Sequence, residues 1–207
     1  MAGRLIVISN RIPTEDEPSG GLVVALHDCL TKQGGVWIGS SGGGCEVPRP
    51  GLQHFASGDY DRYSFDLSES EHEEYYLGYA NSVLWPLFHR RADLMQVQAG
   101  HAEAYKDVNR RLADMLADFI QPDDAIWVHD YHFLPLAHFL RSRAVQNRIG
   151  FFLHIPFPVA SDVPALPEAG EFLDWIGAHD VFGMQTKADV NRCRILFQNA
   201  GGRTEPA

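Results

Sequence analysis

Short runs of β-branched and aromatic residues alternate along the chain with longer segments in which apolar side chains recur every three or four positions. The short runs predict strands, and they lie at residues 5–8, 36–38, 63–65, 125–128, 149–153 and 181–183. The longer segments predict helices at residues 22–33, 68–78, 101–120, 135–143, 168–176 and 186–198. This alternation is typical of an α/β fold, so we expect a Rossmann-like parallel sheet with helices on both faces, formed as a single domain over residues 1–207.

Two of the predicted helices have recognisable starting signals. Ser68 is followed three residues later by Glu71, which is the spacing of a capping box, and Thr186 stands in the same relation to Asp189. In such pairs a side-chain oxygen accepts a hydrogen bond from a backbone N–H that the helix leaves free. We therefore expect helices to begin directly after Ser68 and Thr186, the first running toward Gly78.

Polar side chains stand where several predicted strands end. Ser9, Asn10 and Arg11 follow the first strand, a Gly/Ser loop follows Trp37, and His129-Asp130-Tyr131-His132 and His154 follow two later strands. Ligands of open α/β sheets bind at the carboxyl ends of the strands. If the strands are parallel, these segments meet at one edge of the sheet.

Gly20 and Gly21 precede a predicted helix and lie close in sequence to Arg11. The first backbone N–H groups of a helix attract phosphate, and an arginine can add a bidentate contact. The pattern is neither GxGxxG nor a P-loop, so an ordinary glycine turn with Arg11 in solvent is the competing interpretation.

Asp130 has three interpretations. It could accept hydrogen bonds from a sugar hydroxyl, or cap a helix that begins near Tyr131. A metal site with His129 and His132 is the third, but neighbours on an extended strand end point to opposite sides. His154 is either a site residue at the edge of the sheet or a hydrogen-bonded core histidine.

Three aromatic residues with polar tips, Tyr75, Tyr76 and Trp85, lie in the segment EYYLGYANSVLWP. An apolar ring face beside an O–H or N–H donor suits a sugar. Packing in the core is the alternative, and it is the better interpretation for at least one of the tyrosines.

The composition narrows the function classes. A net charge of −10 disfavours binding to nucleic acid or to an anionic membrane surface, but leaves room for a local site for a phosphorylated small molecule. No apolar run approaches the roughly 18–20 residues that span a bilayer, and the first apolar run is too short for a signal peptide, so we expect a cytoplasmic protein. Cys29, Cys45 and Cys193 are far apart, which predicts reduced thiols.

The order of the motifs is more specific than any one of them. SNRIP, GGVWIGSSG, EYY…NSVLWP, IWVHDYHFLPLA and NRIGFFLHIPFP follow one another along the chain. In this order and separation they resemble the trehalose-6-phosphate synthase family, which consists of retaining glycosyltransferases of the GT-B type. The resemblance runs from about Arg4 to Gln198 and corresponds to the N-terminal half of the family's members.

The resemblance implies an activity and a domain organisation. Members of the family transfer glucose from a nucleotide sugar, usually UDP-glucose, to glucose 6-phosphate, which gives trehalose 6-phosphate. It also implies that residues 1–207 form the acceptor-side domain, that a C-terminal donor-binding domain is absent from this chain, and that no metal or other cofactor takes part. The partners would then be a sugar-phosphate acceptor, a nucleotide-sugar donor, and a missing C-terminal domain or partner subunit. Formation of a homo-oligomer stays open.

The resemblance also implies roles for acceptor residues. Arg11 would contact the acceptor phosphate, Tyr76 and Trp85 would hold the acceptor sugar, and Asp130 would bind its hydroxyls. Asp130 and His154 would be the catalytic residues, and the leaving phosphate itself would take the acceptor proton.

On the donor side, the resemblance implies that Gly20 and Gly21 lie against the donor phosphates and that His154 contacts the donor glucose. One position departs from the family: Ser40 stands where a tryptophan facing the acceptor is usual. The acceptor could therefore be glycerol 3-phosphate or a cyclitol phosphate instead.

Two other functions stay open. One is a non-catalytic module that binds a sugar phosphate. The other is a metal-dependent hydrolase that would use His129, Asp130, His132 and His154.

Overall fold

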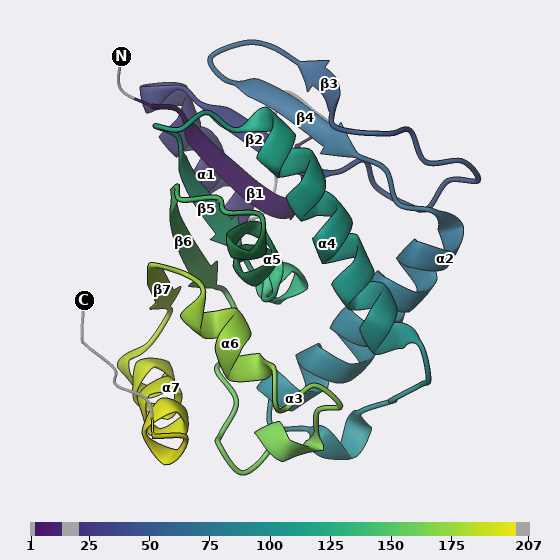
Figure 1. Ribbon diagram of the computed structural model, residues 1–207, viewed down its shortest axis with the longest axis vertical. Helices are drawn as coiled ribbons and strands as arrows, with labels where there is room; N and C mark the ends of the chain where they lie inside the picture. The colour runs from purple at the N-terminus through teal and green to yellow at the C-terminus, as the bar shows by residue number, and fades with distance from the viewer. Residues whose placement is uncertain (1–2, 14–20, 202–207) are drawn as a thin grey trace.

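A computed structural model describes residues 3–13 and 21–201, which form a seven-stranded sheet flanked by helices (Figure 1). The strand order is β3-β4-β2-β1-β5-β6-β7, and every neighbouring pair is parallel except β3 with β4. The strands are β1 (Leu5–Arg11), β2 (Val36–Ser40), β3 (Gln53–Ala56), β4 (Asp61–Phe65), β5 (Ala125–His129), β6 (Arg148–Leu153) and β7 (Val181–Met184). The predicted α/β fold with a largely parallel sheet is confirmed.

The helices connect these strands. They are α1 (Gly21–Gln33), α2 (Glu69–Glu71), the π-helix η1 (His72–Leu84), α3 (Trp85–Phe88), α4 (His101–Phe119), α5 (Leu136–Ser142), α6 (Phe172–Gly177) and α7 (Lys187–Asn199). Three short 3-10 turns complete the set: η2 (Ala92–Leu94), η3 (Tyr131–Phe133) and η4 (Val163–Ala165). Among the residues in these ranges, no helix is long and apolar enough to cross a membrane.

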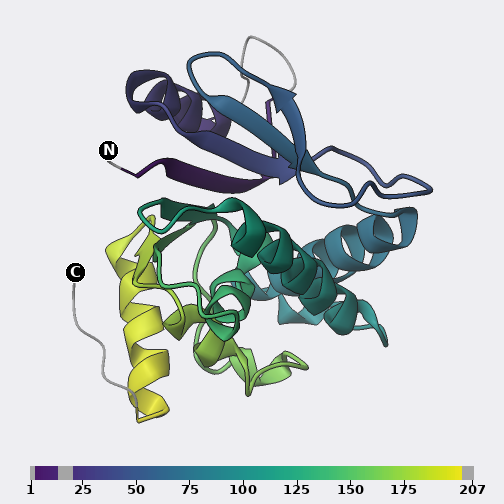
Figure 2. The same cartoon turned by 45° about the horizontal axis from the view of Figure 1, so that its top comes forward.

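Alternate residues of the central strands divide the core into two layers. Ile6, Ile8 and Ile38 face a large cluster that contains the apolar side chains of η1, α4 and α5. Val7 and Trp37 face the opposite side, where α1 covers them. Figure 2 shows α1 on one side of the sheet and α4 and α5 on the other. Burial of apolar surface on both faces is the main force that stabilises such a layered fold.

Strand β3 was not predicted, and it makes the sheet mixed rather than purely parallel. It pairs antiparallel with β4, with His54 opposite Tyr63. It lies at the edge of the sheet, and Phe55 is 45% exposed. Because a short edge strand buries little, its sequence carries no alternation of apolar and polar residues that a pattern search could detect.

The helix that begins after Ser68 has the predicted capping box but not the predicted end. Ser68 Oγ accepts from the Glu71 N–H at 3.0 Å, and Glu71 Oε2 accepts from the Ser68 N–H at 2.8 Å. Gly78 does not end the helix, which continues through η1 and α3 to Phe88. A Cβ at position 78 would lie within 2.4 Å of the His101 ring, so glycine is needed there for close packing rather than for a turn.

Candidate functional site

A cavity of about 240 Å³ lies at the carboxyl ends of β1 and β5, beside the first turn of α1. Its lining consists of Ser9, Asn10, Arg11, Leu22, Val23, Tyr76, His129, Asp130 and His132. Since β1 and β5 are parallel neighbours, their carboxyl ends meet at one edge of the sheet, as the sequence predicts. The structure thus brings together Arg11, Tyr76 and Asp130, which lie far apart along the chain. We call this space the rim cavity.

Arg11 is the cation of the rim cavity. Its Nη2 donates to the Tyr76 hydroxyl over a long 3.5 Å, and its guanidinium lies over the Tyr76 ring, 5.9 Å from the centroid. Within residues 3–13 and 21–201, no carboxylate lies within ion-pair distance of Arg11. A planar guanidinium in this setting is suited to bind an anion such as phosphate.

Asp130 caps a short helix and also lines the rim cavity. Its Oδ1 accepts from the Tyr131 N–H at 3.1 Å, so it caps η3, and it also accepts from the His154 N–H at 3.3 Å. Its backbone has a positive φ of 73°, which directs the chain from β5 into η3. Burial raises the pKa of Asp130 to about 6. The side chain also lines the rim cavity, so capping does not remove it from the site.

His132 and Asn10, which both line the rim cavity, have buried polar atoms without hydrogen-bond partners among the described residues. The His132 ring is stacked between Tyr76 and Tyr131, with centroid distances of 5.6 and 4.1 Å. Both of its ring nitrogens and Asn10 Oδ1 are buried without a hydrogen-bond partner among the described residues. Burial, and then the charge of Arg11, lowers the pKa of His132 to about 3, so its ring is neutral.

Buried polar atoms normally have partners, so this group of atoms indicates a place for a polar ligand. Sequence reasoning missed Asn10 as a contact and considered His132 only as a metal ligand. The position of Asn10 directly before Arg11 was the available signal.

His154 lies beside the rim cavity rather than in its lining. Its Nε2 is 3.0 Å from Nδ1 of His129, whose ring does line the cavity. Burial lowers the pKa of His154, and burial together with His154 lowers that of His129 to about 3. Across the described ranges, no three His, Cys, Asp or Glu side chains are grouped so that they could hold a metal ion. The geometry therefore gives the hydrolase interpretation no support.

Two further predicted site residues, Trp85 and Gly21, are not among the residues that line the rim cavity. Trp85 is 42% exposed and stacks on His89 with a centroid distance of 4.0 Å, outside the lining. Gly21 begins α1, and a Cβ there would meet none of the described residues within 4 Å. Gly20 lies outside the described residues.

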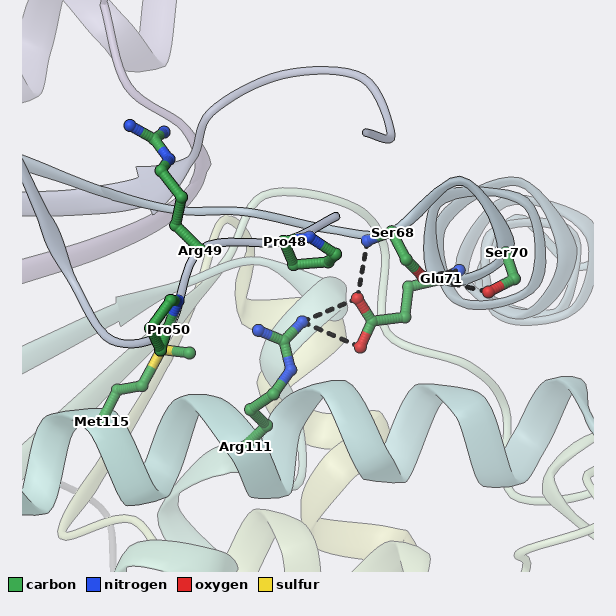
Figure 3. A pocket seen from close by; sticks show the side chains of 8 residues that line it. All are labelled: Pro48, Arg49, Pro50, Ser68, Ser70, Glu71, Arg111 and Met115. Atoms are coloured by element: carbon green, nitrogen blue, oxygen red, sulfur yellow. Dashed lines mark hydrogen bonds and ion pairs between the residues drawn. The ribbon is translucent and has the colours of Figure 1, made fainter. Parts of the chain in front are cut away.

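A second, larger cavity of about 450 Å³ lies between residues 48–50, the start of α2 and the side of α4 (Figure 3). Figure 3 shows the Arg111 guanidinium directed at the Glu71 carboxylate, to whose oxygens it donates at 2.8 Å. Arg49, at the border of this space, pairs with Asp66 at 2.7 Å. Both cations are thus neutralised by neighbouring side chains. We call this space the paired cavity.

The family model of glycosyltransferase family 20 matches residues 5–193. The chain belongs to glycosyltransferase family 20. It is 48% identical to a trehalose-6-phosphate synthase of Enterobacter sp. (strain 638) over 205 residues, which is 98% of this chain and 42% of that protein. The family expected from the motifs is confirmed.

Solved structures agree with this membership. An alpha,alpha-trehalose-phosphate synthase (UDP-forming) from Burkholderia vietnamiensis superposes with a TM-score of 0.94 at 38% identity, covering 100% of this chain and 45% of that one. A second such enzyme, from Burkholderia xenovorans in complex with glucose-6-phosphate, gives a TM-score of 0.91 at 39% identity, covering 99% and 45%. The chain therefore spans less than half the length of the relatives that it matches.

Proposed function

We propose that this chain is the acceptor-side domain of a synthase that transfers glucose from UDP-glucose to glucose 6-phosphate, which yields trehalose 6-phosphate. The observation that carries the proposal is the rim cavity, where the Arg11 cation and the Asp130 carboxyl lie with several unpartnered polar atoms. The names of the relatives supply the donor and acceptor classes: two are UDP-forming, and one was crystallised with glucose-6-phosphate.

Arg11 and Asp130 would bind different parts of the acceptor. Arg11 would bind the phosphate through charge-assisted hydrogen bonds. Asp130, with one oxygen occupied by two backbone N–H groups, would accept hydrogen bonds from sugar hydroxyls. The Tyr76 ring offers an apolar face beside them. Trp85 would contact the sugar only if its side chain turns toward the cavity.

In the reaction, a hydroxyl oxygen of the acceptor forms a bond to C1 of the donor glucose, and the bond from C1 to the donor phosphate breaks. The leaving phosphate takes the proton of that hydroxyl. His154 and the N-terminus of α1 at Gly21 are the groups that this chain offers to the donor. Holding the two substrates in reactive geometry accounts for roughly 7–11 kcal/mol of such barriers.

Another acceptor is the second candidate, and Ser40 favours it. Its side chain is 4% exposed, and its Oγ donates to the Asn10 carbonyl oxygen at 2.7 Å, so it ties β2 to β1. The position therefore offers no aromatic surface to an acceptor. A phosphate with a smaller organic part, such as glycerol 3-phosphate, would keep the contact with Arg11 while making less use of a sugar-binding surface.

The test is binding followed by turnover. The isolated chain is titrated with glucose 6-phosphate and with glucose, and it is then incubated with UDP-glucose and glucose 6-phosphate while release of UDP is measured. We expect binding of the phosphorylated sugar, weaker binding of glucose, and no release of UDP, because the donor needs the part of the relatives that this chain does not span. Equal affinity for both sugars would contradict the proposed acceptor site. Sustained release of UDP would contradict the assignment of the donor site to another domain.

Further predictions about location and partners accompany this proposal. The protein would act in the cytoplasm, and it would work together with a second domain or a partner subunit. Neither nucleic acid nor a membrane is expected to take part.

A further inference from the structure

The imidazole rings of His129 and His154 form a contact that the proposed reaction does not explain. His129 is the last residue of β5, and His154 follows β6, the neighbouring parallel strand. Side chains two residues apart in a strand share a face, so His129 lies beside Trp127 and His154 beside Phe152, at centroid distances of 4.4 and 4.7 Å. These aromatic neighbours support the two rings in one arrangement, with Nδ1 of His129 3.0 Å from Nε2 of His154.

Two ring nitrogens at this distance share one hydrogen. Both rings are neutral, because burial lowers the pKa of each, so one ring donates and the other accepts. If His154 donated, the second nitrogen of His129 would carry a hydrogen. That atom, Nε2, is buried and has no partner among the described residues. Buried N–H donors are left unpartnered less often than acceptors, so the reverse direction is favoured.

We propose that His129 is a positioning residue: it donates from Nδ1 to Nε2 of His154, and so holds His154 in the tautomer that carries its hydrogen on Nδ1. His129 Nε2 is then a bare, buried acceptor on a residue that lines the rim cavity. A ligand with a hydroxyl group fits that atom, since the hydroxyl can donate to it. The pairing of His129 Nε2 with a ligand hydroxyl rests on the proposed function, because that function supplies the sugar. The tautomer of His154 is independent of the proposed function.

Two substitutions test the roles of Nδ1 and Nε2 of His129 separately. In His129→Asn the side-chain amide lies near the position of Nδ1, so it keeps a donor toward His154 and loses the acceptor at the cavity. In His129→Gln the longer side chain brings its amide near the position of Nε2, so it keeps an acceptor at the cavity and loses the donor. The two variants are therefore matched in chemistry and opposite in expected effect.

The first measurement is the tautomer of His154, read from long-range proton–nitrogen NMR spectra of the ¹⁵N-labelled 207-residue chain without ligand. We expect a protonated Nδ1 and a bare Nε2 in the wild type and in His129→Asn, and an altered tautomer in His129→Gln. A protonated Nε2 of His154 in the wild type would overturn the proposal, even if both variants failed to fold. An unchanged tautomer in a folded His129→Gln would overturn it as well.

The second measurement adds glucose 6-phosphate to the same samples. We expect the Nε2 resonance of His129 to move on binding, and the affinity of His129→Asn for the sugar phosphate to fall about three- to tenfold below that of His129→Gln. If the sugar phosphate binds without moving that resonance, the acceptor role of His129 is wrong. If the chain does not bind the sugar phosphate at all, the proposed function fails, while the tautomer result stands by itself.

Discussion

The rim cavity and the paired cavity both contain arginine side chains, yet they differ in what those side chains contact. In the paired cavity Arg111 donates to both oxygens of Glu71, and Arg49 pairs with Asp66. In the rim cavity none of the described carboxylates pairs with Arg11, and buried nitrogens of His132 have no partner within residues 3–13 and 21–201. The paired cavity is thus the larger of the two, and its arginines already form ion pairs.

Whether the polar groups of a cavity are already paired indicates a ligand site better than the volume of the cavity does. Paired groups have little to gain from a ligand, because a new contact would first have to break an existing one. Unpartnered buried groups already bear the cost of desolvation, so a ligand that satisfies them gains free energy. The same reasoning predicts how substitutions in the two cavities should differ.

The largest expected effect concerns Arg11 and Arg111. Arg11→Ala should weaken binding of glucose 6-phosphate by about 1.5–3 kcal/mol, which is about 10- to 150-fold in Kd, because a charge-assisted phosphate contact is lost. Arg111→Ala, the matched change in the paired cavity, should leave Kd within about twofold. Calorimetric titration with glucose 6-phosphate and with glucose measures both. A loss of affinity that is equal for the two sugars would remove Arg11 from the phosphate site.

The second effect is a pH dependence of opposite sign at two carboxyl groups. Burial raises the pKa of Asp130 to about 6, so its contribution to stability is full below about pH 4 and is lost as pH rises toward 6. Asp130→Asn should therefore gain about 2–3 kcal/mol relative to the wild type between pH 4 and pH 7. Denaturant unfolding at several pH values measures the difference, and a constant difference would contradict the raised pKa.

Asp66 supplies the control for that experiment. The Arg49 guanidinium holds the pKa of Asp66 well below its usual range, so its contribution is present above about pH 4 and is lost only as pH falls through the lowered value. Asp66→Asn should consequently lose stability relative to the wild type as pH rises toward about 4, and the difference should then stay constant between about pH 5 and pH 7. A shift in the same direction as that of Asp130→Asn would show that the two carboxyl groups do not differ as their environments indicate.

The third effect is the contribution of the ion pair in the paired cavity to the stability of the protein. Arg111→Ala removes the pair with Glu71, in which both side chains are partly exposed, and should lower the free energy of unfolding by about 1 kcal/mol. Part of this loss should disappear at high salt, because exposed pairs are screened. Unfolding curves in low and high salt measure it. A destabilisation of Arg11→Ala as large as this one would remove the contrast between the cavities.

The smallest effect concerns the choice of acceptor. Since Arg11 is the contact that phosphates share and Ser40 offers no aromatic surface, the Kd values for glucose 6-phosphate and glycerol 3-phosphate should lie within about threefold, or about 0.65 kcal/mol. Competition titrations with a set of sugar phosphates measure the ratio. An exclusive preference for glucose 6-phosphate would show that the serine at position 40 has no influence on the acceptor.

Much of the fold could be predicted because its signals are local. The capping box of Ser68 and Glu71 and the cap of Thr186 at Asp189 involve residues three positions apart, and both occur in the structure. The edge strand β3 and the continuation of the helix past Gly78 could not be predicted in this way. The first has too little burial to leave a pattern, and at the second the glycine packs closely against the distant His101 ring instead of ending the helix.

For the site, the sequence by itself determined the family and the set of polar residues at the strand ends, because motif order and strand ends are properties of the chain alone. Only the tertiary structure decided which of those residues share a cavity, that Trp85 stands outside it, and that His129 contacts His154. Charges and hydrogen bonds between residues far apart in sequence depend on the order and register of the strands that carry them. The strand order β2-β1-β5-β6 places Arg11, His129 and His154 at one edge of the sheet, whereas the arginine at position 111 meets its carboxylate on the side of α4.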